Sequence, residues 1–270
     1  MNKPNSKQAI GIFDSGAGGL TVAAAVRNLL PDEKIIYFGD TAHLPYGDKS
    51  SETVRNYSLR ITDFLLEKKC KVILIACNTA SAAAYEDVKK RANGKAYVIN
   101  VIDPATEFIA SHENLKKVGV IGTKGTIKSK SYETKINALQ SEKEVISIAT
   151  PLLVPMIEEG FIYDNISNSI IKQYLSNEQL NGIDGLILAC THYPIIKNQI
   201  RKFYNFKTTV IDSSVVVAQK LKETLKENNL LNIESKSPKH EFYVSDYTDF
   251  FKTLAEMFFD DEIKLLTKHL

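Results

Sequence analysis

An internal repeat limits the folds that this chain can adopt. Three short apolar segments recur once, in the same order, at offsets of 108 to 113 residues. The matching pairs are residues 10–14 with 118–122, 72–77 with 185–190, and 98–103 with 208–212. One shared segment would be weak evidence, because buried strands resemble one another. Three in the same order favour a duplicated architecture.

Apolar, β-branched runs alternate with helix-like stretches along the chain. Such runs suit parallel strands that are buried on both faces. The expected strands are residues 9–13, 34–38, 72–76, 96–101, 117–121, 144–148, 185–189 and 208–211, with another at 241–244. Helices are expected at residues 53–69 and 81–92, among others. The pattern predicts an α/β fold, and the repeat favours two similar halves, each with a mainly parallel sheet flanked by helices.

The repeat also predicts where the domains divide. Its first unit ends with the strand before Asp103 and its second with the strand before Asp212. We therefore expect a first domain at residues 1–100 and a second at residues 101–212. The segment 213–270 must then pack on one of them.

Charge and composition exclude several classes of protein. The 270 residues carry 34 basic and 32 acidic side chains, so no nucleic-acid or membrane partner is expected. The Lys-rich stretch 220–239 also holds Glu and Asn, which indicates a solvated surface. Residues 1–9 lack an apolar signal core, and no apolar run approaches the roughly 20 residues that span a bilayer. A cytoplasmic location is expected, where the three cysteines would stay reduced.

Polar side chains gather where the expected strands end. Ligands bind beyond the carboxyl ends of parallel strands. Cys77 and Cys190 each stand at such an end. The other polar residues at these ends are Asp14, Ser15, Asn78, Thr79, Thr123, Thr191 and His192. If the two halves face each other, one cleft has a thiol on each wall.

Two facing thiols suit the inversion of a stereocentre. Inversion by proton exchange needs a base on one face and an acid on the other, with roles that swap. A cysteine pKa of about 8.5 can be tuned toward neutrality, so both protonation states are accessible. A lone free cysteine is more often a small buried hydrophobe. Cys70, at the end of a charged helix, fits that structural interpretation, whereas polar residues follow Cys77 and Cys190.

Three further features have both a chemical and a structural interpretation. His192 could tune or reprotonate Cys190, or be an ordinary loop histidine. Asp14 could serve Cys77 in the same way, or cap a helix that begins near Gly19. The glycine-rich turn 16–19 could hold a carboxylate on its backbone N–H groups, or simply form a tight turn. It lacks the lysine of a nucleotide-binding loop.

These residues resemble the glutamate racemase family of bacterial cell-wall synthesis. The matching segments are residues 11–16 (GIFDSG), 18–19 (GG), 37–40 (YFGD), 45–47 (PYG), 76–82 (ACNTASA), 121–123 (IGT) and 190–194 (CTHYP). The resemblance runs from about residue 10 to 212 and continues through 240–245. The pair Thr191 and His192 favours glutamate over aspartate racemases, which resemble this family but usually carry an acidic residue there.

The resemblance implies an isomerase that interconverts L- and D-glutamate without a cofactor or metal and supplies D-glutamate for peptidoglycan. It also implies two pseudo-symmetric α/β domains with the active site in the cleft between them, and segment 213–270 would join the first domain. Cys77 would act on D-glutamate and Cys190 on L-glutamate, assisted by Asp14 and His192. The residues implied to hold the substrate are Asp14, Ser15, Tyr46, Gly47, Asn78, Thr79, Thr123, Thr191 and His192.

The resemblance also implies an assisting glutamate after the segment 151–155. Glu158 is the better match, but the adjacent Glu159 leaves the register open. Thr150 stands where many members have a cysteine, and this departure touches no catalytic role. The sequence leaves the oligomeric state open, and a homodimer is one arrangement compatible with it.

Three other functions remain in competition at this point. The first is an aspartate, hydantoin or other racemase of the same superfamily. The second is a non-enzymatic module that binds an amino acid or phosphate and buries its cysteines. The third is a thiol–disulfide protein, which the absence of a C-x-x-C motif argues against.

Overall fold

The computed structural model describes residues 3–139, 142–234, 238–259 and 263–270. The remaining positions fall in the polar N-terminal segment, the expected second domain, the Lys-rich stretch and the tail. Predictions for those positions lie outside the described residues.

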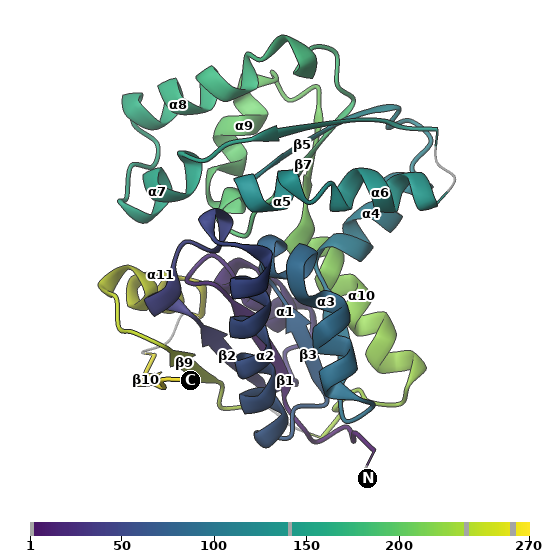
Figure 1. Cartoon of the computed structure of the whole chain (residues 1–270), viewed down its shortest axis with the longest axis vertical. Coiled ribbons are helices and arrows are strands. Elements are labelled where there is room, and N and C mark those ends of the chain that lie inside the picture. The colour runs from purple at the N-terminus through teal and green to yellow at the C-terminus, as the bar shows by residue number, and fades with distance from the viewer. Residues whose placement is uncertain (1–2, 140–141, 235–237, 260–262) are drawn as a thin grey trace.

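The described strands form two sheets, and every strand pairing is parallel (Figure 1). The six-stranded sheet has the order β10-β9-β2-β1-β3-β4, and the four-stranded sheet has the order β6-β5-β7-β8. The strands of the first are β1 (Ile10–Asp14), β2 (Ile35–Gly39), β3 (Val72–Ile75), β4 (Tyr97–Asn100), β9 (Glu241–Val244) and β10 (Leu265–Thr267). Those of the second are β5 (Lys117–Gly122), β6 (Glu144–Ala149), β7 (Gly185–Ala189) and β8 (Thr209–Asp212). We call the elements around these two sheets the first half and the second half.

The sheet orders repeat the duplication seen in the sequence. The run β2-β1-β3-β4 has the same order as β6-β5-β7-β8, with β1 matching β5 and β3 matching β7. The predicted α/β fold is therefore confirmed, and each expected strand lies within a residue or so of its observed bounds. The short strand β10 was not expected. Strands β1, β2, β3 and β7 are fully buried, whereas β4, β6 and β8 lie at edges and are partly exposed.

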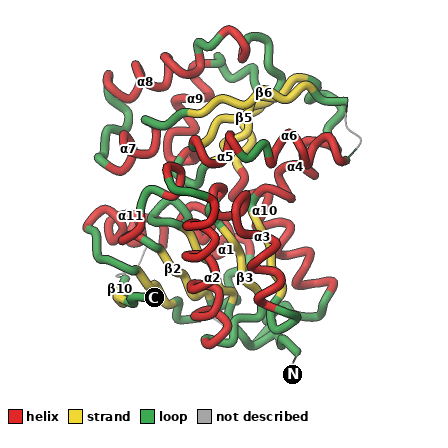
Figure 2. The backbone as a smooth tube through the Cα atoms, in the orientation of Figure 1, coloured by secondary structure: helices red, strands yellow, loops and turns green. Residues whose placement is uncertain are grey.

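Helices cover both faces of each sheet (Figure 2). Those of the first half are α1 (Leu20–Leu29), α2 (Ser51–Glu67), α3 (Asn78–Ala92), α10 (Ser213–Glu227) and α11 (Asp249–Phe259). Those of the second half are α4 (Ile102–Ser111), α5 (Lys124–Lys128), α6 (Ser131–Ala138), α7 (Leu153–Glu158), α8 (Asn165–Leu175) and α9 (Lys197–Phe203). Short 3₁₀ turns are η1 (Thr41–His43), η2 (Tyr46–Asp48), η3 (Glu178–Leu180) and η4 (Tyr193–Ile196).

Helix α3 begins three residues before the expected start at residue 81. Cys77 is its N-cap, and the Cys77 Sγ accepts a hydrogen bond from the Ala80 N–H at 3.5 Å. Asn78 and Thr79, which the pattern placed beyond a strand end, therefore form the first turn of a helix. The polar side chains and the free N–H groups of that turn share one helix end.

A buried ion pair holds distant segments together at the amino ends of the first-half strands. The Lys71 Nζ lies 2.6 Å from the Glu33 carboxylate and also donates to the backbone oxygens of Ser6 and Leu230. The Glu33 carboxylate in turn accepts from the backbone N–H of Asn232 at 2.9 Å. Since both charges are buried, these extra hydrogen bonds offset part of their desolvation. The returning chain is thereby fixed beside β1 and β3.

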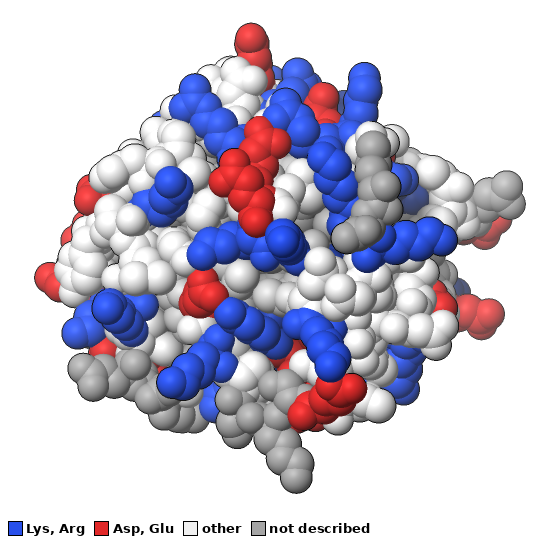
Figure 3. Space-filling view, turned by 90° about the horizontal axis from the view of Figure 1, so that it is seen from below, with Lys and Arg blue, Asp and Glu red and all other residues white. Residues whose placement is uncertain are grey.

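On the face shown in Figure 3, Lys and Arg side chains predominate, and Asp and Glu side chains lie among them. Among the described residues, no helix combines the length and the apolar character needed to cross a membrane.

Candidate active site

The two halves enclose a cavity of about 60 Å³ at the carboxyl ends of their central strands. Ten of the residues predicted from sequence line it: Ser15, Tyr46, Gly47, Cys77, Asn78, Thr79, Thr123, Cys190, Thr191 and His192. Asp14 and Glu158 do not line it and lie behind its wall. The lining residues that sequence reasoning missed are Leu44, Pro45, Asp48, Lys124, Thr150, Pro151, Val154, Pro155 and Ala189.

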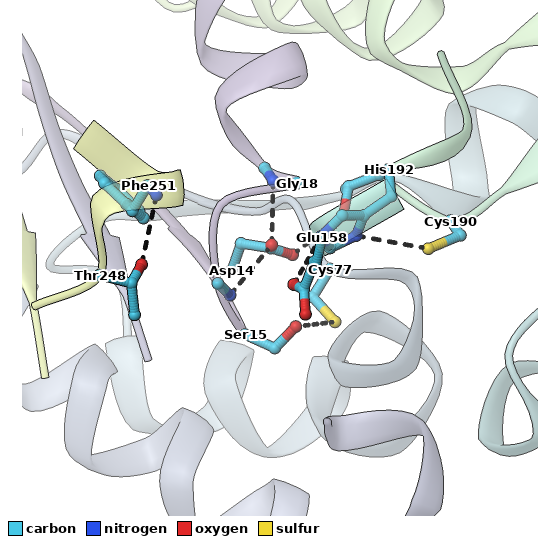
Figure 4. A network of polar contacts seen from close by, with 12 residues as sticks. Asp14, Ser15, Gly18, Cys77, Glu158, Cys190, His192, Thr248 and Phe251 are labelled. Atoms are coloured by element: carbon cyan, nitrogen blue, oxygen red, sulfur yellow. Dashed lines mark hydrogen bonds and ion pairs between the residues drawn. The ribbon is translucent and has the colours of Figure 1, made fainter. Parts of the chain in front are cut away.

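The first-half wall carries Cys77, which is 5% exposed. The Cys77 Sγ donates to the Ser15 Oγ at 3.8 Å (Figure 4). Burial, followed by the nearby Asp14 charge, raises the pKa of Cys77 to about 12. With its pKa raised in this way Cys77 is a neutral thiol around pH 7, and a cation beside it would favour the thiolate.

Asp14 organises the turn behind this wall. Its Oδ2 accepts from the backbone N–H groups of Gly16 and Gly19, at 3.2 and 2.9 Å. The glycine-rich turn thus holds the chain's own carboxylate, so the expected anion site for a ligand is already filled. Asp14 acts on Cys77 through its charge, whereas Ser15 is the hydrogen-bond partner of that thiol. Burial raises the pKa of Asp14, with the His192 charge acting in the opposite direction.

The second-half wall carries Cys190 beside a histidine and a carboxylate. The Cys190 Sγ lies 3.8 Å from the His192 Nδ1, and the His192 Nε2 lies 3.0 Å from the Glu158 Oε1 (Figure 4). Burial lowers the pKa of His192, but Cys190 and Glu158 outweigh that effect and raise it to about 10. Of the two adjacent glutamates, Glu158 makes this contact and Glu159 ends the helix in an exposed position.

The two halves approach each other closely beside the cavity. A Cβ built on Gly18 would lie 2.4 Å from the His192 Nδ1, so any other residue there would displace the imidazole. On the next turn, the Thr21 Oγ1 lies within hydrogen-bond distance of the Gly18 and Thr191 carbonyls, at 2.9 and 3.0 Å. Helix α1 of the first half therefore holds the loop that carries His192.

Tyr46 lines the cavity, but its hydroxyl is turned away from it. The Tyr46 hydroxyl donates to the Asp40 Oδ2 at 2.6 Å, and the His43 Nδ1 lies 2.8 Å from the Asp40 Oδ1. Burial and the Asp40 charge raise the pKa of Tyr46. A bound molecule would therefore meet the ring and backbone of Tyr46 rather than its hydroxyl. The neighbouring Gly47 must lack a side chain, because a Cβ there would lie 2.7 Å from Thr123.

Hydroxyls and an amide join the halves near the first turn of α3. The Thr79 Oγ1 lies 2.9 Å from the Thr123 Oγ1. The Tyr132 hydroxyl, from α6, donates to the Asn78 Oδ1 at 2.7 Å. Both links connect first-half and second-half residues. In the part of the chain that the structure describes, no group of three or more His, Cys, Asp and Glu side chains could hold a metal ion.

This arrangement agrees with the relatives that the chain matches. Residues 20–221 match the family model described as Asp/Glu/Hydantoin racemase. The chain is 42% identical to a glutamate racemase of Chlorobaculum parvum over 97% of this chain and 96% of that one. The crystal structure of glutamate racemase from Francisella tularensis in complex with D-glutamate is 40% identical, with a TM-score of 0.90 over 98% of each chain. A Bacillus anthracis glutamate racemase structure gives 33% identity and a TM-score of 0.93 over 98% of this chain and 99% of that one.

The chain belongs to the glutamate racemase family. Sequence analysis did not name Asp40 as a site residue of this glutamate racemase family member. The sequence nevertheless held a signal for it, because Asp40 ends the matched segment 37–40. Pro151 and Pro155 had one as well, since they bound the segment before Glu158. Tyr132 and Thr21 had none, because each acts on the site across the boundary between the halves.

Proposed function

We propose that this chain interconverts L- and D-glutamate without a cofactor, with Cys77 and Cys190 as acid and base on opposite faces of the substrate. The observation that carries the proposal is that both thiols line one cavity from opposite halves. Membership of the family makes the chain an isomerase acting on amino acids, and the D-glutamate complex of the Francisella tularensis relative supports glutamate as substrate.

The proton transfers balance without any outside group. One cysteine, as thiolate, takes the α-proton, and its sulfur becomes a thiol. The resulting carbanion then takes a proton from the other thiol on the opposite face, which leaves that sulfur as a thiolate. The product has the opposite configuration, and the enzyme is poised for the reverse reaction. Holding both groups next to the reacting carbon accelerates the reaction more than the acidity of either group alone.

The first turn of α3 suits a substrate carboxylate. Backbone N–H groups at a helix start lack intrahelical partners and favour negative charge. In this site Asn78 and Thr79 provide that turn, with Thr191 and Thr123 on the facing wall. Lys124 on the rim adds positive charge, although its Nζ also lies 3.2 Å from an Asp48 oxygen.

The substrate ammonium would supply the cation that Cys77 lacks. Asp14 and Cys77 form a buried region where negative charge is disfavoured, as their raised pKa values indicate. An ammonium placed against Ser15 and Cys77 would favour the thiolate by Coulomb attraction. Binding would therefore activate the base only when the substrate is present.

We further propose that the halves correspond to residues 1–100 with 213–270, and 101–212. The sheets support this division, because β9 and β10 join the first-half sheet and β5 to β8 all lie between residues 117 and 212. Helix α10, which begins at Ser213, packs against α1 in one apolar cluster. The D-glutamate formed would serve peptidoglycan synthesis in the cytoplasm.

The decisive test is exchange at the α-carbon. In deuterated water, each glutamate enantiomer should gain deuterium at Cα and turn into its mirror image without any added cofactor. Aspartate, tested in parallel, should react far more slowly. Racemisation of aspartate with glutamate unchanged would refute the substrate, and binding of glutamate without exchange would favour a non-enzymatic module.

A further inference from the structure

A tyrosine from the second half holds the side chain of Asn78. Tyr132, on α6, is 1% exposed, and Asn78, in the first turn of α3, is 3% exposed. The Tyr132 hydroxyl donates to the Asn78 Oδ1 at 2.7 Å. Asn78 lines the cavity and Tyr132 does not, so the tyrosine can act on a bound molecule only through the amide.

The direction of this hydrogen bond decides what Asn78 can offer. A side-chain amide has an oxygen that accepts and a nitrogen that donates two hydrogens. The Tyr132 hydroxyl donates to the Asn78 Oδ1, and burial, which raises the pKa of Tyr132, keeps the proton on that hydroxyl. The amide oxygen is therefore turned toward Tyr132, and the N–H groups are left for the cavity, where a carboxylate would accept them.

We propose that Tyr132 is a positioning residue that fixes the Asn78 amide with its N–H groups toward the substrate carboxylate. The inference rests on the proposed function, since it assigns a determinant of carboxylate binding at the same site. It also links binding to the arrangement of the halves. Tyr132 belongs to the second half and Asn78 to the first, so the donors are set only when the halves adopt the relation seen here.

The test is Tyr132→Phe, which removes the hydroxyl and keeps the ring in its apolar cluster with Ile102 and Ile136. The KM for both enantiomers should rise about tenfold while kcat changes less than about threefold, because the lost contact holds ground state and transition state alike. In an Asn78→Ala background, the same change should have no further effect on KM, since the amide it orients is gone.

Tyr204→Phe is the matched control. The Tyr204 hydroxyl is also buried, but it has no hydrogen-bond partner among the described residues. Its removal should leave KM and kcat as in the unmodified protein. A structural role for Tyr132 would instead lower the unfolding temperature with KM unchanged, and that result would overturn the proposal, as would a KM effect that persists in the Asn78→Ala background.

A measurement on the unmodified protein covers the case in which Tyr132→Phe does not fold. The side-chain NH₂ resonance of Asn78, assigned by its loss in Asn78→Ala, should shift when D-glutamate is added. An unshifted resonance in a sample that racemises glutamate refutes the orientation and leaves the proposed function standing. Absence of α-carbon exchange in the unmodified protein refutes the proposed function itself.

Discussion

Cys77 and Cys190 occupy matching places in the two halves, at the ends of β3 and β7, yet different side chains surround them. Burial and the nearby Asp14 charge raise the pKa of Cys77 and leave it a neutral thiol, with the Ser15 hydroxyl as its hydrogen-bond partner. Cys190 has an imidazole whose pKa is raised to about 10, with Glu158 on its far side. The duplication therefore provides two sulfurs in matching positions, while their electrostatic surroundings diverged.

The difference indicates two ways of stabilising a thiolate during the reaction. On the Cys190 wall, a protonated imidazole within the protein can stabilise negative sulfur in both the presence and the absence of substrate. On the Cys77 wall, the neighbouring groups are the Ser15 hydroxyl and the Asp14 carboxylate, so we expect the substrate ammonium to be the cation that favours the thiolate.

The largest expected effect comes from removing either sulfur. Cys77→Ser and Cys190→Ser should each lower racemisation by about a thousandfold or more in both directions, because a hydroxyl is far too weak an acid to replace the thiolate. Circular dichroism of glutamate solutions measures this rate. Cys70→Ser is the control, since Cys70 lies in the core of the first half away from the cavity. Near-normal racemisation by either active-site variant would refute the two-thiol mechanism.

Half-reactions of the same variants test each cysteine separately as a base. Elimination from a β-substituted glutamate analogue needs one deprotonation and no proton return on the opposite face. Cys77→Ser should therefore retain elimination from the L-analogue, and Cys190→Ser from the D-analogue. The reverse preference would mean that Cys77 acts on the L-enantiomer and Cys190 on the D-enantiomer, and the two-base mechanism would still hold.

His192→Asn should produce the next largest effect. Because the two enantiomers have equal free energy, kcat/KM must fall equally in both directions, by about a hundredfold. The asymmetry should emerge in elimination, which should slow for the L-analogue, whose base is Cys190, and persist for the D-analogue. Asp14→Asn should show the opposite preference. Equal losses with both analogues in both variants would mean that the walls are coupled rather than distinct.

Glu158→Gln should change the pH dependence more than the maximal rate. The Glu158 charge and hydrogen bond help raise the pKa of His192. When Gln weakens these two interactions, the pKa of His192 should fall from about 10 toward its ordinary value. The imidazolium would then be lost at lower pH, and the alkaline limb of kcat/KM should move in the same direction. An NMR titration of His192 follows the cause directly. Glu159→Gln, at the exposed neighbour, should leave both curves unchanged.

Thr21→Val should have the smallest effect. It removes the hydroxyl that lies 3.0 Å from the Thr191 carbonyl, and so loosens the loop that carries His192 without touching either sulfur. We expect kcat to fall about threefold, the cost of one modest hydrogen bond. Thr21→Ser keeps the hydroxyl and should behave like the unmodified protein in steady-state assays. A loss in the serine variant as large as in the valine variant would show that the methyl group, not the hydroxyl, matters.

The sequence allowed the fold and most of the cavity wall to be predicted, because both depend on local patterns. Buried parallel strands appear as apolar runs, and their carboxyl ends identify the residues that face the site. Contacts between the halves could not be predicted this way. Tyr132 and Thr21 lie on helix faces that look like ordinary packing surfaces, and only the relation of the halves brings them to Asn78 and Thr191.

Local geometry also altered two expectations. The glycine-rich turn was compatible with a ligand anion, but a carboxylate five residues before Gly19 already fills it. Tyr46 was expected among the groups that hold the substrate, yet a carboxylate six residues before it takes its hydroxyl. Both acceptors were visible in the sequence. The side-chain directions that bring them to these donors were not.

The first-half sheet draws strands from both ends of the chain, which bears on synthesis by the ribosome. Chains emerge from the amino end at about 5–20 residues per second, and units fold as they become complete. All the strands of the second-half sheet have emerged by residue 212, whereas β9 and the Leu230 carbonyl that Lys71 binds arrive later. The half that is begun first is therefore completed last. Its central strands are covered by α10 and α11 only after the second half has emerged, so one apolar face of the first-half sheet stays incomplete in that interval.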